Sequence, residues 1–368
     1  MRISRRTFLA SSALVVSGPR ALAQTLPSTQ PTTRKLGWAV VGLGSLSRGQ
    51  LLPALAKTTH SRLAAVVTGS PEKDRAVARQ YKLDASHCYS YETFDRMRDD
   101  ADVDVVYIVL PNSMHAEYTL RAATIGKHVF CEKPMAVSVA ECRQMIEACA
   151  AAKRKLSIAY RMLYEPNLIE ARRLCRDGAI GKVTSITSVF GFNIGAFGGW
   201  RLNRKMSGGG PLMDIGIYSI NAARFVTGEE PTEVTAKIQA APDDARFKEV
   251  EAAMDFTLKF PGGALATCRT AYNASLGTSL RITGERGWIN LTPAFMYGGN
   301  LLSCSRDGGA VEWLTKPYVN GFAAEIDDFS QCVMDDKPSR TPGEEGLRDM
   351  LVIEALYRAA AEGNVVRL

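Results

Sequence analysis

Residues 36–47 read LGWAVVGLGSLS, a short apolar run followed by the glycine pattern G-x-G-x-x-S. A buried strand that ends in such a turn and leads into a helix is the phosphate-binding start of a dinucleotide-binding unit. Gly42 allows the tight turn, Gly44 lets backbone approach a pyrophosphate, and Ser47 is small enough for close helix–sheet packing. A plain strand-to-helix turn looks similar, but this one opens the first strand–helix–strand unit of the chain. The predicted phosphate loop consists of Gly42, Leu43, Gly44, Ser45 and Leu46.

Strand-like and helical segments alternate from this loop to about residue 160. Because helices separate the strands, the pattern predicts an α/β domain with a parallel, doubly wound Rossmann sheet. The expected strands are 36–41, 62–68, 103–110, 128–131 and 156–160, and the expected helices are 45–58, 71–81, 115–125 and 139–152.

The second half of the chain has a different pattern, in which turn signals such as Pro261-Gly262-Gly263 join strand-like runs. This pattern predicts an α+β domain with a large, mostly antiparallel, open sheet. The expected strands are 183–193, 234–241, 252–260, 264–272, 280–283 and 288–291, and the helices 166–177, 211–227, 322–335 and 343–363. Thr341 is the expected cap of the last helix. We therefore expect a dinucleotide-binding domain over 35–160 and a substrate and oligomerisation domain over 161–368, with the last helix returning to the first.

The start of the chain predicts export. Arg5 and Arg6 precede an apolar run too short to span a bilayer, and a small-x-small cleavage pattern ends at Ala23. We interpret residues 1–23 as a twin-arginine signal peptide, with a general secretory signal as the alternative. Residues 24–34 read as an extended arm. The expected product is a periplasmic protein without a membrane anchor.

The composition excludes a nucleic-acid-binding role and gives no sign of a metal site. The chain has 368 residues and a net charge of +7, of which the leader's arginines, four in the first 23 residues, carry more than half. No basic stripe of the kind that nucleic-acid binders show is visible in the rest. The eight cysteines form no C-x-x-C pair and no cluster with histidine, so zinc is not indicated and buried free thiols are favoured, although disulfides stay open.

The end of the second expected strand favours NADP over NAD. An NAD enzyme usually carries a carboxylate there, which accepts a hydrogen bond from the ribose 2′-hydroxyl. This chain has hydroxyl residues and nearby cations instead, which suit a 2′-phosphate, although Glu72 argues against it. The residues expected around the phosphate are Thr68, Gly69, Ser70, Lys73 and Arg75, with Arg48 as a further candidate.

Two further motifs carry side chains of the kinds that enzymes use in catalysis. Lys133, in the sequence Cys131-Glu132-Lys133-Pro134, follows a predicted parallel strand, and open α/β sheets bind their ligands at that end of the strands. A surface lysine before a proline turn is the alternative. Asp214 and Tyr218 stand at i and i+4 of an expected helix and would share one face.

Together these motifs resemble the glucose–fructose oxidoreductase family (Gfo/Idh/MocA), including its periplasmic aldose–aldose oxidoreductase branch. The resemblance covers residues 35–365 and rests on G-L-G, on L-P-N-x-x-H at 110–115, on C-E-K-P at 131–134 and on D-I-G-I-Y at 214–218. It implies catalytic roles for Lys133, Asp214 and Tyr218, where the broader superfamily usually carries histidine in place of Tyr218. Implied sugar-binding residues are Lys133, Tyr160, Arg161, Asp214 and Tyr218, and implied nucleotide-binding residues are Leu110, Pro111, Asn112, His115, Glu132, Lys133, Arg161, Trp200 and Arg201. The glycine-rich stretch 193–199 departs from the family and leaves the sugar specificity open.

The residues suggest how such a reaction would proceed. Oxidation of an aldose at C1 needs a base for the hydroxyl proton near the nicotinamide. An ammonium about 4 Å from a phenolate stabilises it by roughly 4 kcal/mol at an effective dielectric of 20. Lys133 beside Tyr218 would therefore make Tyr218 a base, while Asp214 would orient the lysine or the sugar. An ordinary core tyrosine is the alternative for Tyr218.

Export adds a constraint, because the periplasm holds no appreciable pool of NADP. A tightly bound NADP would be reduced by one sugar and reoxidised by a second, in a ping-pong cycle that releases a lactone and an alditol. The alternatives are an ordinary NADP-dependent aldose dehydrogenase with exchangeable cofactor and a non-catalytic periplasmic sugar-binding protein. The donor sugar, the acceptor (fructose or another aldose) and the choice between a homodimer and a homotetramer stay open.

Overall fold

The computed structural model describes residues 34–195 and 198–368. The predicted signal peptide and nearly all of the predicted arm, residues 1–33, lie outside the described residues. Residues 35–368 form one compact unit that contains two sheets.

The first sheet is the predicted parallel sheet. Its strand order is β3-β2-β1-β4-β5-β6, and each neighbouring pair is parallel, as in a dinucleotide-binding Rossmann domain. The strands are β1 (Leu36–Val41), β2 (Ser61–Val67), β3 (Cys88–Tyr89), β4 (Val105–Ile108), β5 (His128–Glu132) and β6 (Leu156–Ala159). The helices are α1 (Leu52–Leu55), α2 (Pro71–Tyr81), α3 (His115–Thr124) and α4 (Val139–Ala151). The helix expected over 45–58 is instead a π-helical turn, Ser47–Leu51, that continues into the short α1.

The second sheet has nine strands in the order β14-β13-β12-β11-β7-β10-β9-β8-β15. Its neighbours are antiparallel except β7 and β10, which confirms the mostly antiparallel prediction. The strands are β7 (Val183–Asn193), β8 (Glu233–Gln239), β9 (Ala253–Lys259), β10 (Leu265–Ala271), β11 (Asn273–Gly284), β12 (Gly287–Leu291), β13 (Leu302–Arg306), β14 (Glu312–Trp313) and β15 (Val366–Arg367). The remaining helices are α5 (Pro166–Arg176), α6 (Arg204–Ser207), α7 (Ile217–Thr227), α8 (Gly321–Met334) and α9 (Gly343–Glu362).

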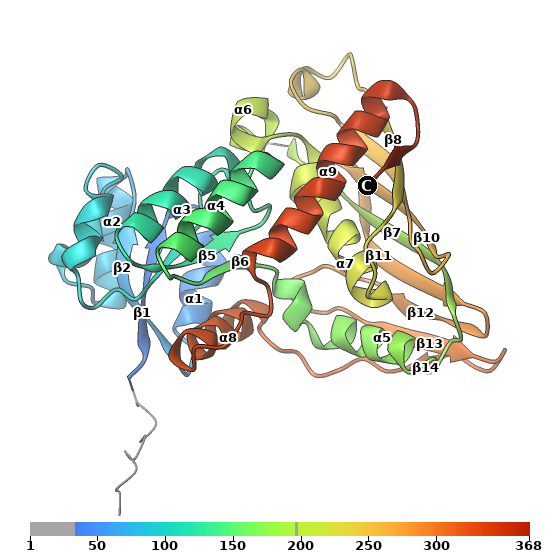
Figure 1. Cartoon of the computed structure of the whole chain (residues 1–368), viewed down its shortest axis with the longest axis horizontal. Coiled ribbons are helices and arrows are strands. Elements are labelled where there is room, and N and C mark those ends of the chain that lie inside the picture. Colours follow the sequence, from blue (N-terminus) through green and yellow to red (C-terminus); the bar gives the residue numbers. More distant parts are fainter. Residues whose placement is uncertain (1–33, 196–197) are drawn as a thin grey trace, which may run out of the picture. The chain divides into compact units, whose positions relative to one another are not determined.

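The late helix α9 connects the two sheets, and the helix α8 lies on the first domain (Figure 1). The helix α9 contacts α4 and β6 of the first domain as well as β8 of the second. The helix α8 packs on the Rossmann domain more fully, because Phe329 joins the core around Trp38 and the Trp38 indole N–H donates to the Ser330 hydroxyl at 2.9 Å. Both helices therefore return to the first domain, although only the last was expected to. Thr341 does not cap α9, because its carbonyl accepts from Ile158 of β6 and Pro342 stands at the cap position.

Side chains on the nine-stranded sheet alternate between a covered and an open face. In β10, Ala266 and Cys268 are buried while Leu265 and Thr267 are exposed. The helices α5, α7 and α9 contact this sheet. All eight cysteines lie in the described residues and are free thiols. Within residues 34–195 and 198–368, none of the helices combines the length and apolar character needed to cross a bilayer.

Candidate active site

Lys133 follows directly after β5, at the carboxyl end of the parallel sheet. A buried histidine fixes the loop around it. Both ring nitrogens of His115 lie 2.9 Å from a main-chain oxygen, Nε2 from Leu110 and Nδ1 from Pro134. His115 is fully buried and joins the loops after β4 and β5, and its expected contact with a nucleotide remains a prediction.

Lys133 is held by Asp214 from the second domain. Its ammonium donates to the main-chain oxygen of Asp214 at 2.6 Å and to Oδ1 at 3.1 Å. The side chains are 13% and 18% exposed, so the pair is largely shielded from water but open to a ligand. Asp214 lies in a π-helical turn, Leu212–Gly216, that runs into α7. The structure therefore brings together two residues that are far apart in the sequence.

Two more donors hold the other oxygen of Asp214. Arg201 Nε lies 3.0 Å from Oδ2, and the Tyr272 hydroxyl donates to the same atom at 2.6 Å. Burial alone would raise the pKa of Asp214, but the charges of Lys133 and Arg201 and the hydrogen bond from Tyr272 outweigh it and lower the pKa. Asp214 therefore stays ionised and is poorly suited to act as a general base.

Tyr218, one turn after Asp214, lies between two cations. Lys133 Nζ is 4.9 Å from the centroid of the Tyr218 ring, and the Arg161 guanidinium carbon is 5.1 Å from it. The ring is half-buried against Phe190 and Phe295. Burial acts to lower the pKa of Lys133, but the attraction of Tyr218, Asp214 and Glu132 outweighs it and raises the pKa. Lys133 therefore remains an ammonium beside the phenol.

Arg161 is held by residues of the second domain. Its guanidinium donates to the main-chain oxygens of Phe295 and Met296, at 2.6 and 3.1 Å, and lies 4.7 Å from the Tyr297 ring centroid. Arg161, Tyr297 and Phe322 also line a cavity of about 200 Å³. The structure thus places Arg161 against the Tyr218 ring, whereas the expected contacts of Arg161 with nucleotide and sugar remain predictions.

The other residues expected to bind nucleotide or sugar differ in how deeply they are buried and in what they contact. Trp200 lies beneath Arg201, whose guanidinium carbon is 4.5 Å from the indole centroid. Glu132 is buried, and its Oε1 accepts from the Tyr107 hydroxyl at 2.8 Å. Tyr160 is buried in the core, where burial and the nearby Asp349 carboxylate raise its pKa well above the ordinary value, and its expected contact with a sugar remains a prediction.

The glycine loop fits a pyrophosphate. Gly42 has φ of +94°, and a Cβ added there would lie 2.3 Å from the Val109 main-chain oxygen, so only glycine is tolerated. A Cβ added at Gly44 meets no atom within 4 Å, which leaves the backbone open to a ligand. The Ser47 hydroxyl donates to the Gly42 carbonyl at 2.5 Å and closes the turn. Leu43 is buried, Ser45 is exposed and Leu46 is half-buried.

The end of β2 lies beside this loop, because the Gly42 amide donates to the Val67 carbonyl at 2.8 Å. The Thr68 hydroxyl accepts from the Ser70 amide, and the Ser70 hydroxyl accepts from the Lys73 amide at the start of α2. Lys73 and Arg75 are exposed, while Gly69 lies against the Tyr91 ring. These residues fit the 2′-phosphate of NADP, since none of those at the strand end is acidic. On the other side, the Asn112 side chain donates to the Ser207 carbonyl at 2.8 Å, and Pro111 is half-buried.

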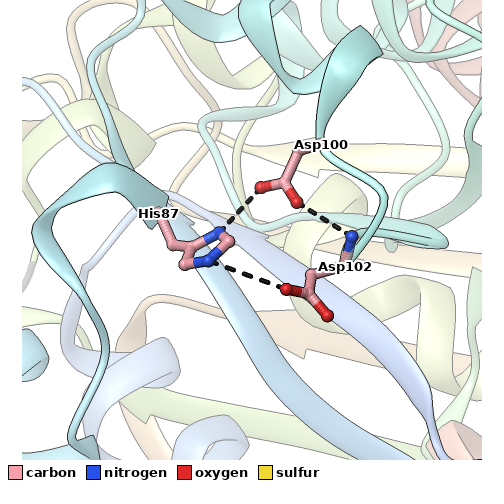
Figure 2. A group of neighbouring side chains, drawn as sticks. All are labelled: His87, Asp100 and Asp102. Carbon is pink, nitrogen blue, oxygen red and sulfur yellow. Dashed lines mark hydrogen bonds and ion pairs between the residues drawn. The ribbon is translucent and has the colours of Figure 1, made fainter.

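One other cluster resembles a metal site. Figure 2 shows His87 beside two carboxylates, with Nδ1 2.8 Å from Asp100 Oδ2 and Nε2 3.8 Å from Asp102 Oδ2. The Tyr89 hydroxyl also donates to Asp100, and the Asp102 amide donates to the other Asp100 oxygen. These hydrogen bonds and ion pairs explain why the three side chains lie together, as a network of charged and polar groups.

Comparison with known proteins agrees with the fold and the motifs. Residues 36–160 match the model of an oxidoreductase family with an NAD-binding Rossmann fold, and residues 168–290 match the GFO/IDH/MocA C-terminal domain. A D-xylose 1-dehydrogenase [NADP(+)] of Haloarcula marismortui is 31% identical over 344 residues, 92% of this chain and 94% of that protein. The chain belongs to the Gfo/Idh/MocA family.

Solved structures of the family share the architecture. An aldose-aldose oxidoreductase from Caulobacter crescentus, complexed with glycerol, superposes with a TM-score of 0.89 at 47% identity, over 91% of this chain and 100% of that one. A 3-ketoreductase from Actinomadura kijaniata, in complex with TDP-benzene and NADP, superposes with a TM-score of 0.77 at 22% identity, over 89% and 98% of the two chains. The second likeness concerns the fold alone.

Two residues of this Gfo/Idh/MocA site were not predicted. Tyr272 ends an expected strand, and a buried tyrosine hydroxyl needs a partner, so the sequence did hold a signal. Tyr297 lies in an irregular loop after Thr292-Pro293, where no periodicity marks it.

Proposed function

We propose that this NAD(P)-dependent sugar oxidoreductase oxidises an aldose at C1 to its lactone and reduces a second sugar to an alditol. The second sugar is another aldose or fructose. The observation that carries the proposal is the placement of Tyr218 between Lys133 and Arg161, with Lys133 held by an ionised Asp214. The similarity to the aldose-aldose oxidoreductase at 47% identity supports the same reaction class.

The chain's own residues move the proton. Tyr218 accepts the proton of the C1 hydroxyl in the first half-reaction and returns it to the carbonyl oxygen of the second sugar. Lys133 stabilises the phenolate that exists before the first proton transfer and again after the second, because its raised pKa keeps it charged throughout. Asp214, with a lowered pKa, keeps Lys133 in place and takes no proton.

Bound NADP supplies the two-electron carrier that both sugars use in turn. The aldose loses two hydrogen atoms and the carbonyl of the second sugar gains two, so the cycle balances without another oxidant. Gly42 and Gly44 would hold the pyrophosphate, and Ser70 and Lys73 the 2′-phosphate, which favours NADP over NAD.

Retention of the nucleotide belongs to the proposal. We propose that residues 1–23 send the chain to the periplasm by the twin-arginine route with NADP already bound. We also propose that residues 24–34 help to keep the NADP in its binding site. The open face of the nine-stranded sheet, on which Leu265 is 43% exposed, supports a homo-oligomer.

An ordinary aldose dehydrogenase with exchangeable NADP is the second candidate, favoured by the relative named D-xylose 1-dehydrogenase [NADP(+)]. The two candidates differ in cofactor content. Purified protein would be desalted, denatured gently and analysed by mass spectrometry for pyridine dinucleotide. We expect close to one NADP per chain, whereas an empty protein that turns over only with added NADP would support the dehydrogenase.

A further inference from the structure

The Asp214 carboxylate, which binds Lys133, also accepts hydrogen bonds from two other side chains. Asp214 receives a surface donor and an interior donor at the same oxygen, Oδ2. The surface donor, Arg201, comes from a 3₁₀ turn, Gly199–Leu202, and its side chain is 35% exposed. The interior donor, Tyr272, is fully buried.

The Tyr272 side chain is fixed from several directions. Its amide donates to the Ala252 carbonyl at 2.8 Å, and its own carbonyl accepts from the Ile194 amide at 2.9 Å. Its ring packs in a small apolar cluster with Ile194 and Ile215 and lies 5.6 Å from the Phe192 ring. The hydroxyl therefore has one position, and from there it reaches Asp214 at 2.6 Å.

We propose that Tyr272 is the positioning residue of the active site, which holds the Asp214 carboxylate in the orientation that directs Oδ1 at Lys133. The inference rests on the proposed function. Because the Arg201 side chain is partly exposed, it is free to engage the hydroxyls of an incoming sugar, and Tyr272 keeps Asp214 in place when it does. Without the hydroxyl, Oδ2 depends on Arg201 alone and the carboxylate can rotate, so that Lys133 keeps its bond to the Asp214 main-chain oxygen but loses the one to Oδ1 that fixes its position beside Tyr218.

Tyr272→Phe tests this proposal in the full-length holoprotein. We expect the rate of nicotinamide reduction at saturating aldose to fall about tenfold, the effect of losing one charge-assisted hydrogen bond. The aldose concentration for half-maximal rate and the NADP content per chain should change by less than about twofold. Tyr164→Phe is the matched control, because it also removes a tyrosine–aspartate hydrogen bond of 2.8 Å, to Asp328, away from the site. It should leave the rate unchanged.

A double-mutant cycle separates positioning from packing. If Tyr272 acts through Asp214, the Tyr272→Phe change should have no further effect in an Asp214→Asn background. A wild-type rate in Tyr272→Phe, or effects of the two changes that multiply, would overturn the inference. Failure of the proposed function looks different, since the wild-type protein itself would then reduce no nicotinamide with any aldose.

Discussion

Replacing Lys133 by methionine tests the electrostatic basis of the site. Methionine retains much of the length and apolar stem but removes the ammonium 4.9 Å from the Tyr218 ring centroid. For an ammonium about 5 Å from the phenolate charge, Coulomb's law at an effective dielectric of about 20 gives about 3 kcal/mol of stabilisation, which the change would remove. The loss corresponds to a roughly 150-fold slower proton transfer. Asp214 keeps its bonds to Arg201 and Tyr272, so the fold should persist.

The assay is single-turnover reduction of the bound nicotinamide by an aldose, followed by absorbance after rapid mixing, with NADP content per chain measured alongside. Lys127→Met is the control, because Lys127 is a part-buried lysine that also donates to main-chain oxygens, those of Asp100 and Val103, outside the site. It should leave the rate within about twofold. A Lys133→Met protein that keeps its NADP and reduces it at the wild-type rate would refute the role of Lys133.

Three more predictions concern the base, the nucleotide loop and the core. Tyr218→Phe should abolish turnover while leaving NADP bound, and retained turnover measured by product chromatography would remove Tyr218 as the base. Gly42→Ala should lower both the thermal midpoint and the NADP content, because its Cβ would lie 2.3 Å from the Val109 oxygen, and an unchanged midpoint in calorimetry would contradict this. Arg224→Met should cost about 3–5 kcal/mol in urea unfolding, since it leaves the fully buried Asp349 carboxylate without its cation. A loss below about 1 kcal/mol would count against that network.

The parallel half of the fold was predictable because most of its strands are largely apolar runs between helices, although the two-residue β3 was not expected. The second sheet was less so where its strands carry small polar residues. The strand β13 was missed because Ser303 and Ser305 hide its apolar pattern, although both are buried between β12 and β14. For β11, only 280–283 was expected, because the exposed first part, from Asn273, has no apolar alternation.

The residues of the site likewise divide into those that local sequence patterns predict and those that they do not. The glycine loop and the strand ends follow from local patterns, and the facing of Asp214 and Tyr218 toward Lys133 agrees with the i, i+4 spacing. Tyr160, directly after β6, is buried in the same core as Ile158, and no local pattern indicated this burial. Contacts such as Tyr272 with Asp214 join residues 58 apart, and no local pattern encodes them.

The central claim is that one retained NADP serves two sugars in turn. The most direct measurement mixes the purified, desalted protein with an aldose, both alone and together with fructose, without added nucleotide, and identifies the products by chromatography. The account predicts lactone (or its aldonic acid) and alditol in equal amounts, over many turnovers per chain. Product formation that stops after one turnover both with the aldose alone and with the aldose and fructose together, or that requires added NADP, would contradict it.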